Sequence, residues 1–270
     1  MSISPAARIH PTAIIAAEAE VGHNVEIGPY AVIEGRVRIG PDCVIRPHAV
    51  LCGPLTLGRG NIVFPGAILG EAPQHLKYNN EATATEIGDF NSFREHVTVH
   101  RGTSHSWVTR IGHHNYFMAN SHVGHDCTIG NHCIITNGAL IGGHSSIADN
   151  VYLSGNSAVH QFVRIGRLAM LSGCSASTKD VPPFVITQGI DATAGVNLVG
   201  MRRAGLTHEQ INAVRQAFRI IFREGLILPT AVGRLEQELS GIDVIQEMID
   251  FLKACPKGIN PIRSRHADAA

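Results

Sequence analysis

Residues that can take part in proton transfer are concentrated between positions 122 and 144, among them His122, His125, Asp126 and His144. An imidazole titrates near neutral pH and can remove a proton from a hydroxyl, and an adjacent carboxylate can orient the ring or stabilise its charged form. Gly143 lies in the same segment, and its N–H, with no side chain in the way, could donate to an oxyanion. These residues are suited to acyl transfer by direct attack of a hydroxyl. No serine lies in a G-x-S-x-G motif, so a covalent acyl-enzyme is not indicated.

A hexapeptide repeat dominates the segment in which this set lies. Counting every sixth residue from Ile9 to Leu171 gives 28 positions, and all but His75, Glu81 and His105 are Ile, Leu, Val or Phe. A helix repeats about every 3.6 residues and a strand about every 2, so a strict period of six indicates neither alone. It indicates a solenoid of short strands.

Small residues mark a second position of the repeat, four residues after the aliphatic one, as at Ala31, Cys127 and Ser145. The turns are expected to place Gly or Asn beside the aliphatic residue, as at Gly40 and Gly130. The pattern resembles the left-handed parallel β-helix of the hexapeptide-repeat acyltransferases. That resemblance implies a three-sided coil made of three hexapeptides, with the aliphatic side chains filling the prism.

A coil of three hexapeptides predicts which residues lie side by side. Residue n would lie against residue n+18 at the spacing between neighbouring strands, about 4.8 Å. His125 then lies against Gly143, Asp126 against His144, and Gly143 against Gln161. The base, its carboxylate and the N–H donor are therefore expected in one patch.

The hexapeptide rhythm is broken twice and then ends. The polar stretches 71–86 and 103–109 are expected to be loops that leave the prism. The pattern stops after Pro182 and Pro183, and Thr207 with Gln210 predicts a capping box at the start of a helix. Two more helices are expected near 230–240 and 243–254. We therefore expect a β-helix over residues 1–186 and a small α-helical domain over residues 187–270.

Composition excludes several classes of protein. The 22 basic and 22 acidic residues balance, so there is no overall positive field for nucleic acid or anionic lipid. No run of about 18 apolar residues and no signal-peptide pattern are present, which favours a cytoplasmic protein without membrane insertion. The six cysteines form no C-x-x-C pair, so we expect reduced, buried thiols and neither disulfides nor a zinc knuckle.

Longer motifs resemble one acyltransferase family. They are GEAPQHLKY at 70–78, REHVTVHRGT at 94–103, NSHVGHDCTIGN at 120–131, GALIGGH at 138–144, AVHQF at 158–162, SGCS at 172–175 and DVPPFVITQG at 180–189. These runs closely resemble the UDP-N-acetylglucosamine O-acyltransferases of lipid A biosynthesis. The resemblance implies transfer of an (R)-3-hydroxyacyl group from acyl carrier protein to the glucosamine 3-hydroxyl of UDP-N-acetylglucosamine. It further implies a homotrimer with sites between neighbouring prisms, and no metal or other cofactor.

The same resemblance implies residue roles. His125 matches the general base, Asp126 its orienting partner and Gly143 the oxyanion donor. The matching substrate-binding positions are Lys77, His122, His144, His160, Gln161, Gly173, Asn197 and Arg203. Glycine at 173 would permit a longer acyl chain.

Four positions depart from the family pattern. His75 stands where an Asp is common, and Val199 and Ala204 stand where better-known members have Glu and a second Arg. Asp191 replaces a common His at the end of the acyl pocket. We therefore expect the contacts to the nucleotide and the end of the acyl pocket to differ in detail from those of the better-known members.

The acyl carrier protein is acidic, so a local basic surface is expected despite the zero net charge. Arg215, Arg219 and Arg223 recur every four residues on the helix that begins at Thr207. This arginine stripe is a candidate docking surface, although it would also suit a solvated helix face.

Three other readings remain open from the residues alone. The γ-type carbonic anhydrases share the scaffold and bind zinc with three histidines, for which His122, His125 and His144 could serve. Another hexapeptide acyltransferase could use acetyl-CoA or acylate the amine of a UDP-3-acyl-glucosamine. A β-helix without chemistry would need no clustered His and Asp. Neither the acyl chain length nor the acceptor atom, oxygen or nitrogen, follows from the sequence.

Overall fold

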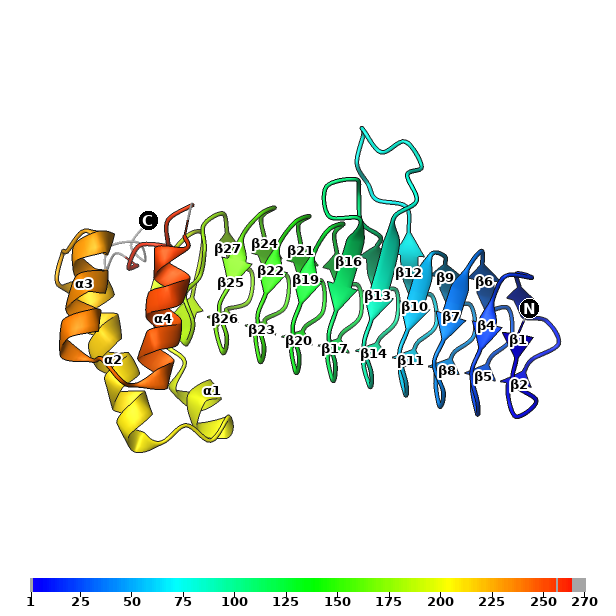
Figure 1. Cartoon of the computed structure of the whole chain (residues 1–270), viewed down its shortest axis with the longest axis horizontal. Coiled ribbons are helices and arrows are strands. Elements are labelled where there is room, and N and C mark those ends of the chain that lie inside the picture. Colours follow the sequence, from blue (N-terminus) through cyan, green and yellow to red (C-terminus); the bar gives the residue numbers. More distant parts are fainter. Residues whose placement is uncertain (1, 256, 264–270) are drawn as a thin grey trace.

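The computed structural model describes residues 2–255 and 257–263, and it is a long three-sided prism with helices at one end (Figure 1). Three parallel sheets form its walls, and the chain visits them in turn. Sheet A contains β1 (Ser2–Ile3), β4 (Glu20–Val21), β7 (Val37–Ile39), β10 (Leu55–Leu57), β13 (Ala84–Ile87), β16 (Val108–Ile111), β19 (Thr128–Ile129), β22 (Ser146–Ile147) and β25 (Arg164–Ile165). Sheet B contains β2 (Arg8–Ile9), β5 (Glu26–Ile27), β8 (Val44–Ile45), β11 (Ile62–Val63), β14 (Ser92–Phe93), β17 (Tyr116–Phe117), β20 (Ile134–Ile135), β23 (Tyr152–Leu153), β26 (Met170–Leu171), β28 (Val185–Thr187) and β29 (Thr193–Val196). Sheet C contains β3 (Ile14–Ile15), β6 (Val32–Glu34), β9 (Val50–Cys52), β12 (Ile68–Glu71), β15 (Thr98–His100), β18 (His122–Val123), β21 (Leu140–Ile141), β24 (Ala158–Val159) and β27 (Ala176–Ser177).

The register of the strands confirms the predicted solenoid. Strands of neighbouring coils pair positions n and n+18, as in Glu20 with Arg38 and Ile134 with Tyr152. Two steps are longer in each of the three sheets, and in sheet A they are the pairings of Leu55 with Thr85 and of Thr85 with Thr109. The chain between them leaves the prism as the loops 72–83 and 101–107, which rise from one side of the molecule (Figure 1). Loops are thus present near both predicted stretches, although residues 84–86 and 108–109 belong to β13 and β16.

Each loop adds whole hexapeptides to its coil. The chain between the paired residues Leu55 and Thr85 is longer than in a regular coil by two hexapeptides. The chain between Thr85 and Thr109 is longer by one. The aliphatic register therefore continues unchanged on the far side of each loop. The three exceptions to the register, His75, Glu81 and His105, are the residues that this count places inside the loops. They need not be apolar because they are outside the prism.

The interior of the prism holds the residues that the repeat predicts. The every-sixth side chains, such as Leu51, Phe93 and Ile135, have no exposed surface, and neither do small residues such as Ala31 and Cys127. These two positions alternate around the coil and fill the narrow interior completely. The inward assignment of the repeat is confirmed.

The turns differ from the expectation. The glycine after the aliphatic residue has no special backbone angle at Gly40, but a Cβ there would lie 2.6 Å from the carbonyl carbon of Gly58. Glycine is needed because successive coils approach closely. The left-handed conformation falls two residues later, and mostly on larger residues such as Asp42, Asp126 and His144 at φ near 60°. Asn, Asp and His tolerate this conformation better than most residues.

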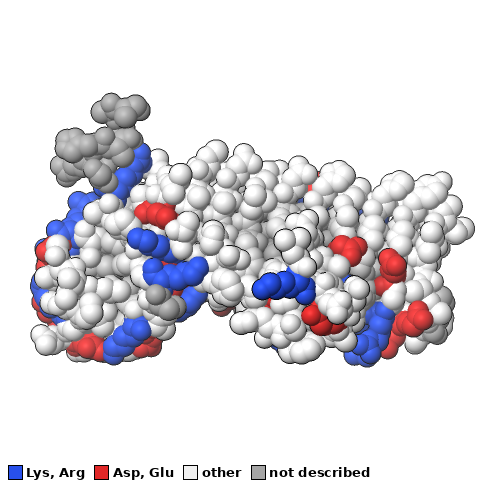
Figure 2. All heavy atoms as spheres, turned by 90° about the horizontal axis from the view of Figure 1, so that it is seen from above, with Lys and Arg blue, Asp and Glu red and all other residues white. Residues whose placement is uncertain are grey.

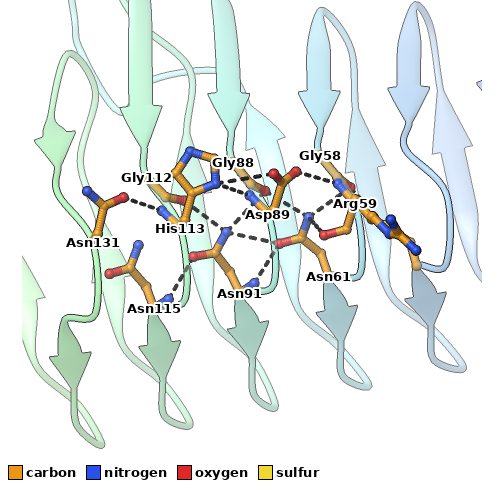
Figure 3. A network of polar contacts seen from close by, with 11 residues as sticks. Gly58, Arg59, Asn61, Gly88, Asp89, Asn91, Gly112, His113, Asn115 and Asn131 are labelled. Atoms are coloured by element: carbon orange, nitrogen blue, oxygen red, sulfur yellow. Dashed lines mark hydrogen bonds and ion pairs between the residues drawn. The ribbon is translucent and has the colours of Figure 1, made fainter.

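A ladder of buried asparagines crosses three coils along the edge between sheets A and B, on the same coils that carry the loops (Figure 3). Asn61 accepts from Asn91, through its backbone N–H at 2.9 Å and its side-chain amide at 3.0 Å. Asn91 in turn accepts from the N–H of Asn115 at 2.9 Å. The amide groups also donate to turn carbonyls, including those of Gly88 and Gly130. These bonds satisfy polar groups that would be costly to bury unpaired, and they hold the three coils in register.

The C-terminal part covers one end of the prism. β28 pairs with β29 in antiparallel fashion, and four helices follow: α1 (Leu198–Arg203), α2 (His208–Arg223), α3 (Leu228–Glu238) and α4 (Asp243–Lys253). The capping box of Thr207 and Gln210 and the three predicted helices are present, whereas α1 was not predicted. The division proposed between residues 186 and 187 lies inside β28, so sheet B continues across it.

Two arginines tie the helices to the prism. Arg167 makes hydrogen bonds to both carboxylate oxygens of Glu247 at 2.6–3.0 Å. Arg164 donates to the carbonyl of Ala254 and lies 4.3 Å from the centre of the Phe251 ring. Both guanidinium groups are therefore committed to the junction with α4.

The cysteine prediction is partly wrong. All six cysteines are free, and Cys43, Cys52, Cys127 and Cys133 are buried. Burial raises the pKa of Cys43 to about 11. Cys174, however, is exposed, because it occupies a left-handed turn position that points away from the interior.

None of the helices within the described residues combines the length and the apolarity that a membrane span requires.

Candidate active site

The clustered residues lie on the edge of the prism where the chain passes from sheet C to sheet A, here called the C–A corner. His125 and Asp126 follow β18, and Gly143 and His144 follow β21 on the next coil. The N–H of His144 donates to the carbonyl of His125 at 2.9 Å, so the predicted neighbours do lie side by side. Both loops rise from this same corner, because each joins a strand of sheet C to a strand of sheet A.

His125 and Asp126 form a base and carboxylate pair. Nδ1 of His125 lies 2.7 Å from Oδ2 of Asp126, which leaves Nε2 as the ring nitrogen available to a substrate. A Cβ on Gly143 would lie 2.8 Å from this Nε2, so only glycine leaves room for the ring. The N–H of Gly143 donates no hydrogen bond within the described residues. A base and an N–H donor without a hydrogen-bond partner in the described residues therefore lie beside one another.

The short loop holds the Asp126 carboxylate. Oδ1 accepts from the N–H of Thr103 at 2.9 Å and from Ser106, while Oδ2 accepts from the Thr103 hydroxyl at 2.7 Å. Burial alone would raise the pKa of this carboxyl, but the hydrogen bonds from Ser106, His125 and Thr103 outweigh it and hold the pKa well below its ordinary value. Asp126 is thus ionised at neutral pH and fixed in direction.

This arrangement predicts how acid affects stability. Because the folded pKa of Asp126 is depressed, its stabilising contribution is complete above the ordinary pKa of about 3.9 and is lost as pH falls toward the folded pKa. Ser106→Ala removes the hydroxyl donor, so it should destabilise the protein by about 1–2 kcal/mol at pH 7. The loss should be nearly the same at pH 3, because the Asp126 carboxylate of the folded protein is still ionised there. Denaturant unfolding at both pH values measures it. Ser146→Ala, on the outer face of β22, is the matched control, and a loss for Ser106→Ala no larger than that of this control would contradict the assignment.

Two further histidines reach the site from the loops. The ring of His75 lies edge-on to His125 with centres 5.2 Å apart, and that of His105 lies edge-on to His144 at 4.6 Å. Nδ1 of His144 is 3.6 Å from Asp126 Oδ2. Burial lowers the pKa of His144, an effect that the Asp126 carboxylate opposes, so this ring is neutral near pH 7.

His122 lies three residues before His125 in the chain, on the outer face of sheet C. Its Nδ1 is 2.8 Å from the hydroxyl of Thr98, and its ring lies edge-on to His100 with centres 4.9 Å apart. Burial, with smaller contributions from His100 and His125, lowers the pKa of His122 to about 4. His122 is therefore a neutral hydrogen-bonding group at physiological pH.

The longer loop is fastened to the prism by Arg101. Its Nε donates to the hydroxyl of Tyr78 at 3.1 Å. Its Nη1 donates to the carbonyls of Gly53 and Gly70 at 3.1 and 3.2 Å. This contact fixes the segment that carries His75 and the exposed Lys77.

Sequence reasoning missed Arg101, Thr103, Ser106 and His105 as parts of the site. The first two stand in the motif at 94–103, and His105 was visible only as an exception to the aliphatic register. Nothing in the spacing showed that their loop folds back onto Asp126.

The other predicted residues occupy three places. Gln161 stacks on Gly143 at the C–A corner, since Phe162 N–H donates to the Gly143 carbonyl, and His160 precedes it. Gly173 is exposed on the corner between sheets B and C. Asn197 and Arg203 line a groove of about 560 Å³ on sheet B with Tyr152, Met170 and neighbouring residues. Within one chain, Gly173, Asn197 and Arg203 therefore lie apart from His125 and the residues around it.

The residues that could hold a zinc ion differ from the three histidines considered from the sequence. His125, Asp126 and His144 have ligand atoms within 4.8 Å of one another, whereas His122 is not in the group. Both oxygens of Asp126 already accept hydrogen bonds from the short loop. A three-histidine site is therefore not assembled in the described chain.

Comparison with known proteins supplies the family. A family model described as UDP N-acetylglucosamine O-acyltransferase, domain 2, matches residues 180–260, and the bacterial transferase hexapeptide model matches residues 18–53 and 109–143. A relative from Anaeromyxobacter sp. strain K, named acyl-[acyl-carrier-protein]–UDP-N-acetylglucosamine O-acyltransferase, is 52% identical over 93% of this chain and 98% of its own length. The chain belongs to the UDP-N-acetylglucosamine O-acyltransferase family.

Solved structures agree with this family. A UDP-N-acetylglucosamine acyltransferase from Bacteroides fragilis is 39% identical, with a TM-score of 0.87 over 97% of this chain and all of that one. One from Campylobacter jejuni is 32% identical, with a TM-score of 0.89 over 95% of this chain and all of that one. The β-helix with a helical C-terminal part is thus the family's fold, and the carbonic anhydrase reading is set aside.

Proposed function

We propose that this protein transfers an (R)-3-hydroxyacyl group from acyl carrier protein to the glucosamine 3-hydroxyl of UDP-N-acetylglucosamine, the first step of lipid A biosynthesis, in the cytoplasm. The names of its relatives support the donor and the acceptor. The observation that carries the chemistry is the His125–Asp126 pair beside Gly143, whose N–H has no hydrogen-bond partner in the described residues.

The proposed reaction is a direct displacement at a thioester. Nε2 of His125 takes the proton of the 3-hydroxyl as its oxygen attacks the thioester carbonyl, and Asp126 stabilises the imidazolium through Nδ1–H. The tetrahedral oxyanion accepts a hydrogen bond from Gly143 N–H. Its collapse breaks the carbon–sulfur bond, and the thiolate leaves with the proton returned by His125. The products are the 3-O-acyl sugar nucleotide and the free thiol, without an acyl-enzyme or a cofactor.

The surrounding residues are assigned to binding. His122, His144, His160 and Gln161 lie beside the base along sheet C and the C–A corner, where the sugar and the start of the acyl chain would lie. Lys77, on the loop 72–83 that Arg101 fastens to the prism, is assigned to binding of the sugar nucleotide. Asn197 and Arg203 are assigned to uridine and phosphate, since a guanidinium suits a diphosphate, and Gly173 to the far end of the acyl chain.

The three faces of the prism support a homotrimer. The outward residues of sheet A are mostly polar or charged, among them Glu20, Arg38, Glu86 and Arg110. Those of sheet C include Ile14, Val32, Val50, Ile68 and Leu140, with Ile14 65% and Leu140 48% exposed. Sheet B adds Ile134, Tyr152 and Met170. Two apolar faces and one polar face fit a prism that packs against two copies of itself.

Such packing would complete the site. His122 lies in the apolar row of sheet C, so the C–A corner borders a face that the trimer would cover. The groove with Asn197 and Arg203 lies on sheet B, the other apolar face. The base His125 of one copy would then lie next to Asn197 and Arg203 of its neighbour. This arrangement accounts for the separation of these residues within one chain.

One assay tests the function. Purified protein is given UDP-N-acetylglucosamine and a panel of 3-hydroxyacyl carrier proteins of graded chain length, and the acylated nucleotide is identified by mass spectrometry. Transfer to the 3-hydroxyl is expected, with a preference for one length. Turnover only with acetyl-CoA, or only with a UDP-3-acyl-glucosamine amine as acceptor, would replace the proposal by another hexapeptide acyltransferase.

The arginine stripe of α2 is the proposed docking surface for the acidic carrier. Arg219 is 62% exposed and lies 3.3 Å from Glu224, and Arg215 donates to the side chain of Asn212 at 3.5 Å, its one hydrogen bond to a side chain among the described residues. Arg223 lies 5.8 Å from the Phe218 ring. None of these contacts buries the charge, so the stripe is available to a partner.

Reversing Arg215, Arg219 and Arg223 to Glu should raise KM for the acyl donor about tenfold and leave KM for UDP-N-acetylglucosamine nearly unchanged, because steering by exposed charge acts on the carrier alone. In the wild type the donor KM should rise with salt, and in the variant this dependence should flatten. Arg110→Glu, on the outer face of sheet A, is the control. An unchanged donor KM would make the stripe a solvated face. Arg164 and Arg167 could not replace it, since both are committed to α4.

A further inference from the structure

Two histidines converge on one oxygen of the Asp126 carboxylate. Oδ2 of Asp126 lies 2.7 Å from Nδ1 of His125 and 3.6 Å from Nδ1 of His144. Each of the three residues offers one ligand atom, and these atoms all lie within 4.8 Å of one another. Two imidazoles and a carboxylate are a common set of protein ligands for Zn²⁺ in sites that keep a fourth position open. The cluster therefore has the types and the number of ligands that such a zinc ion requires.

One nitrogen of His144 has no partner in the described part of the chain. Its Nδ1 is buried and forms no hydrogen bond with any described residue, and 3.6 Å from Asp126 Oδ2 is too long for one. A buried nitrogen without a partner is costly. Zinc–nitrogen bonds of about 2.0–2.1 Å at tetrahedral angles place two ligand atoms about 3.3 Å apart. The observed separation thus suits two atoms that share a metal ion.

The short loop can hold Asp126 in the same place when a metal ion binds. Oδ1 accepts from Thr103 and Ser106, and Oδ2 accepts from the Thr103 hydroxyl. Only the contact between Oδ2 and His125 has to change, because the metal ion replaces the hydrogen that lies between them. Their separation of 2.7 Å would widen by about 0.6 Å. The carboxylate is therefore positioned by groups that do not compete with the metal.

The charges around the cluster favour a cation. The groups that act electrostatically on His144 are Asp126, His125, His105 and His75. The rings of His75 and His105 come from the two loops, with centres 5.2 Å from that of His125 and 4.6 Å from that of His144. Figure 2, seen from the side on which the loops rise, shows mostly uncharged surface between the loops and the helical end. Among these groups a divalent cation would meet one carboxylate and no lysine or arginine.

A second pair of histidine and carboxylate lacks the third ligand. Nδ1 of His113 lies 3.4 Å from Oδ2 of Asp89 on the edge between sheets A and B (Figure 3). Oδ1 of Asp89 accepts from the N–H of Arg59 at 2.7 Å. Within the described residues, His125, Asp126 and His144 are the one group of three such ligands. His113 and Asp89 therefore supply a matched comparison for a zinc site.

We propose that Zn²⁺ binds His125, Asp126 and His144 and reversibly inhibits acyl transfer. The inhibition rests on the proposed function, whereas the binding can be measured without substrates. Bound zinc occupies Nδ1 of His125, so the single ring hydrogen of the neutral imidazole moves to Nε2, and no proton is gained or lost. Nε2 then has no lone pair to take the proton of the attacking hydroxyl. The metal ion inhibits by holding the base in the wrong tautomer.

Calorimetric titration of zinc sulfate alone into metal-free protein measures the binding. The wild type should bind one zinc ion per chain in its tightest site. Loss of a group that only orients a metal ligand costs about 10–100-fold in affinity, so His144→Ala, which removes a ligand, should weaken binding by at least about tenfold. His113→Ala is the matched control and should bind as the wild type does. Co²⁺ should give the visible absorption of a tetrahedral site in the wild type and not in His144→Ala, and melting temperatures check folding.

Transfer assays with the wild type measure the inhibition. Saturating zinc should lower kcat by at least about 100-fold, as loss of a general base does, with a midpoint equal to the Kd from calorimetry. KM for UDP-N-acetylglucosamine should stay unchanged, and a chelator should restore the full rate.

Each other outcome overturns the proposal. If the wild type binds no zinc, or if His144→Ala binds it equally well, the site does not exist. Bound zinc that leaves kcat unchanged would refute the inhibition of the base. Failure of the metal-free wild type to acylate UDP-N-acetylglucosamine would instead refute the proposed function, while calorimetry would still decide the zinc site.

Discussion

His125→Ala should lower the rate of acyl transfer by about 10²- to 10⁴-fold, the usual cost of losing a general base, while the protein keeps its melting temperature. The ring lies outside the interior of the prism, where it packs against His75 and His144 with 12% of the side chain exposed, so its removal leaves the interior packing unchanged. Asp126 keeps its bonds to Thr103 and Ser106 in the variant, so its buried charge is not left unpaired. Single-turnover assays and thermal unfolding measure the two quantities.

The controls for this variant separate chemistry from folding. His23→Ala removes an exposed histidine of another coil and should change neither quantity. Asp126→Asn should slow transfer by less than His125→Ala, because it alters the direction and basicity of the ring but leaves it in place. A His125→Ala protein that keeps a third of the wild-type rate would exclude His125 as the base.

Ile129→Asp should prevent folding altogether. Ile129 is 2% exposed and lies between Ile111 and Ile147 of the neighbouring coils. A carboxylate there would be buried without a partner, at a cost of several kcal/mol or a forced protonation, in a protein whose stability is of the same size. The expected result is insoluble or unfolded protein in expression trials and by circular dichroism.

The adjacent residue supplies a control on the same strand. Thr128 points outward from the polar sheet A, so Thr128→Asp should fold and melt close to the wild type. Ile135→Asp, on sheet B and fully buried, should repeat the failure. Well-folded Ile129→Asp protein would refute the inward assignment of the every-sixth residue.

The sequence predicts well those features that the repeating coil alone determines, namely which residues are buried and which lie side by side on neighbouring coils. A buried position recurs in every hexapeptide, so Ile129 and its equivalents could be recognised without coordinates, and the coil of three hexapeptides brought His125 to Gly143. The buried Asn61, Asn91 and Asn115 occupy the register of small residues and are inward for the same reason. Each of these results depends only on a fixed spacing along the chain.

What lies outside the coil could not be predicted in the same way. The loop that carries Thr103 and Ser106 has no period, and its path back to Asp126 depends on bonds that spacing does not encode. Helix α1 is six residues long, too short for a clear apolar pattern. Lys257 donates to the carbonyl of Gln161 at the C–A corner, a contact between residues 96 positions apart.

The antiparallel strand β29 and the helices behind it have a consequence for assembly. A coil of parallel strands has no intrinsic last turn, and its final sheet edges could accept further strands from another molecule. Here β29 reverses direction against β28, and the helices cover that end (Figure 1). The helical end is therefore closed to further strands, and the molecules are protected from joining into fibres through that end.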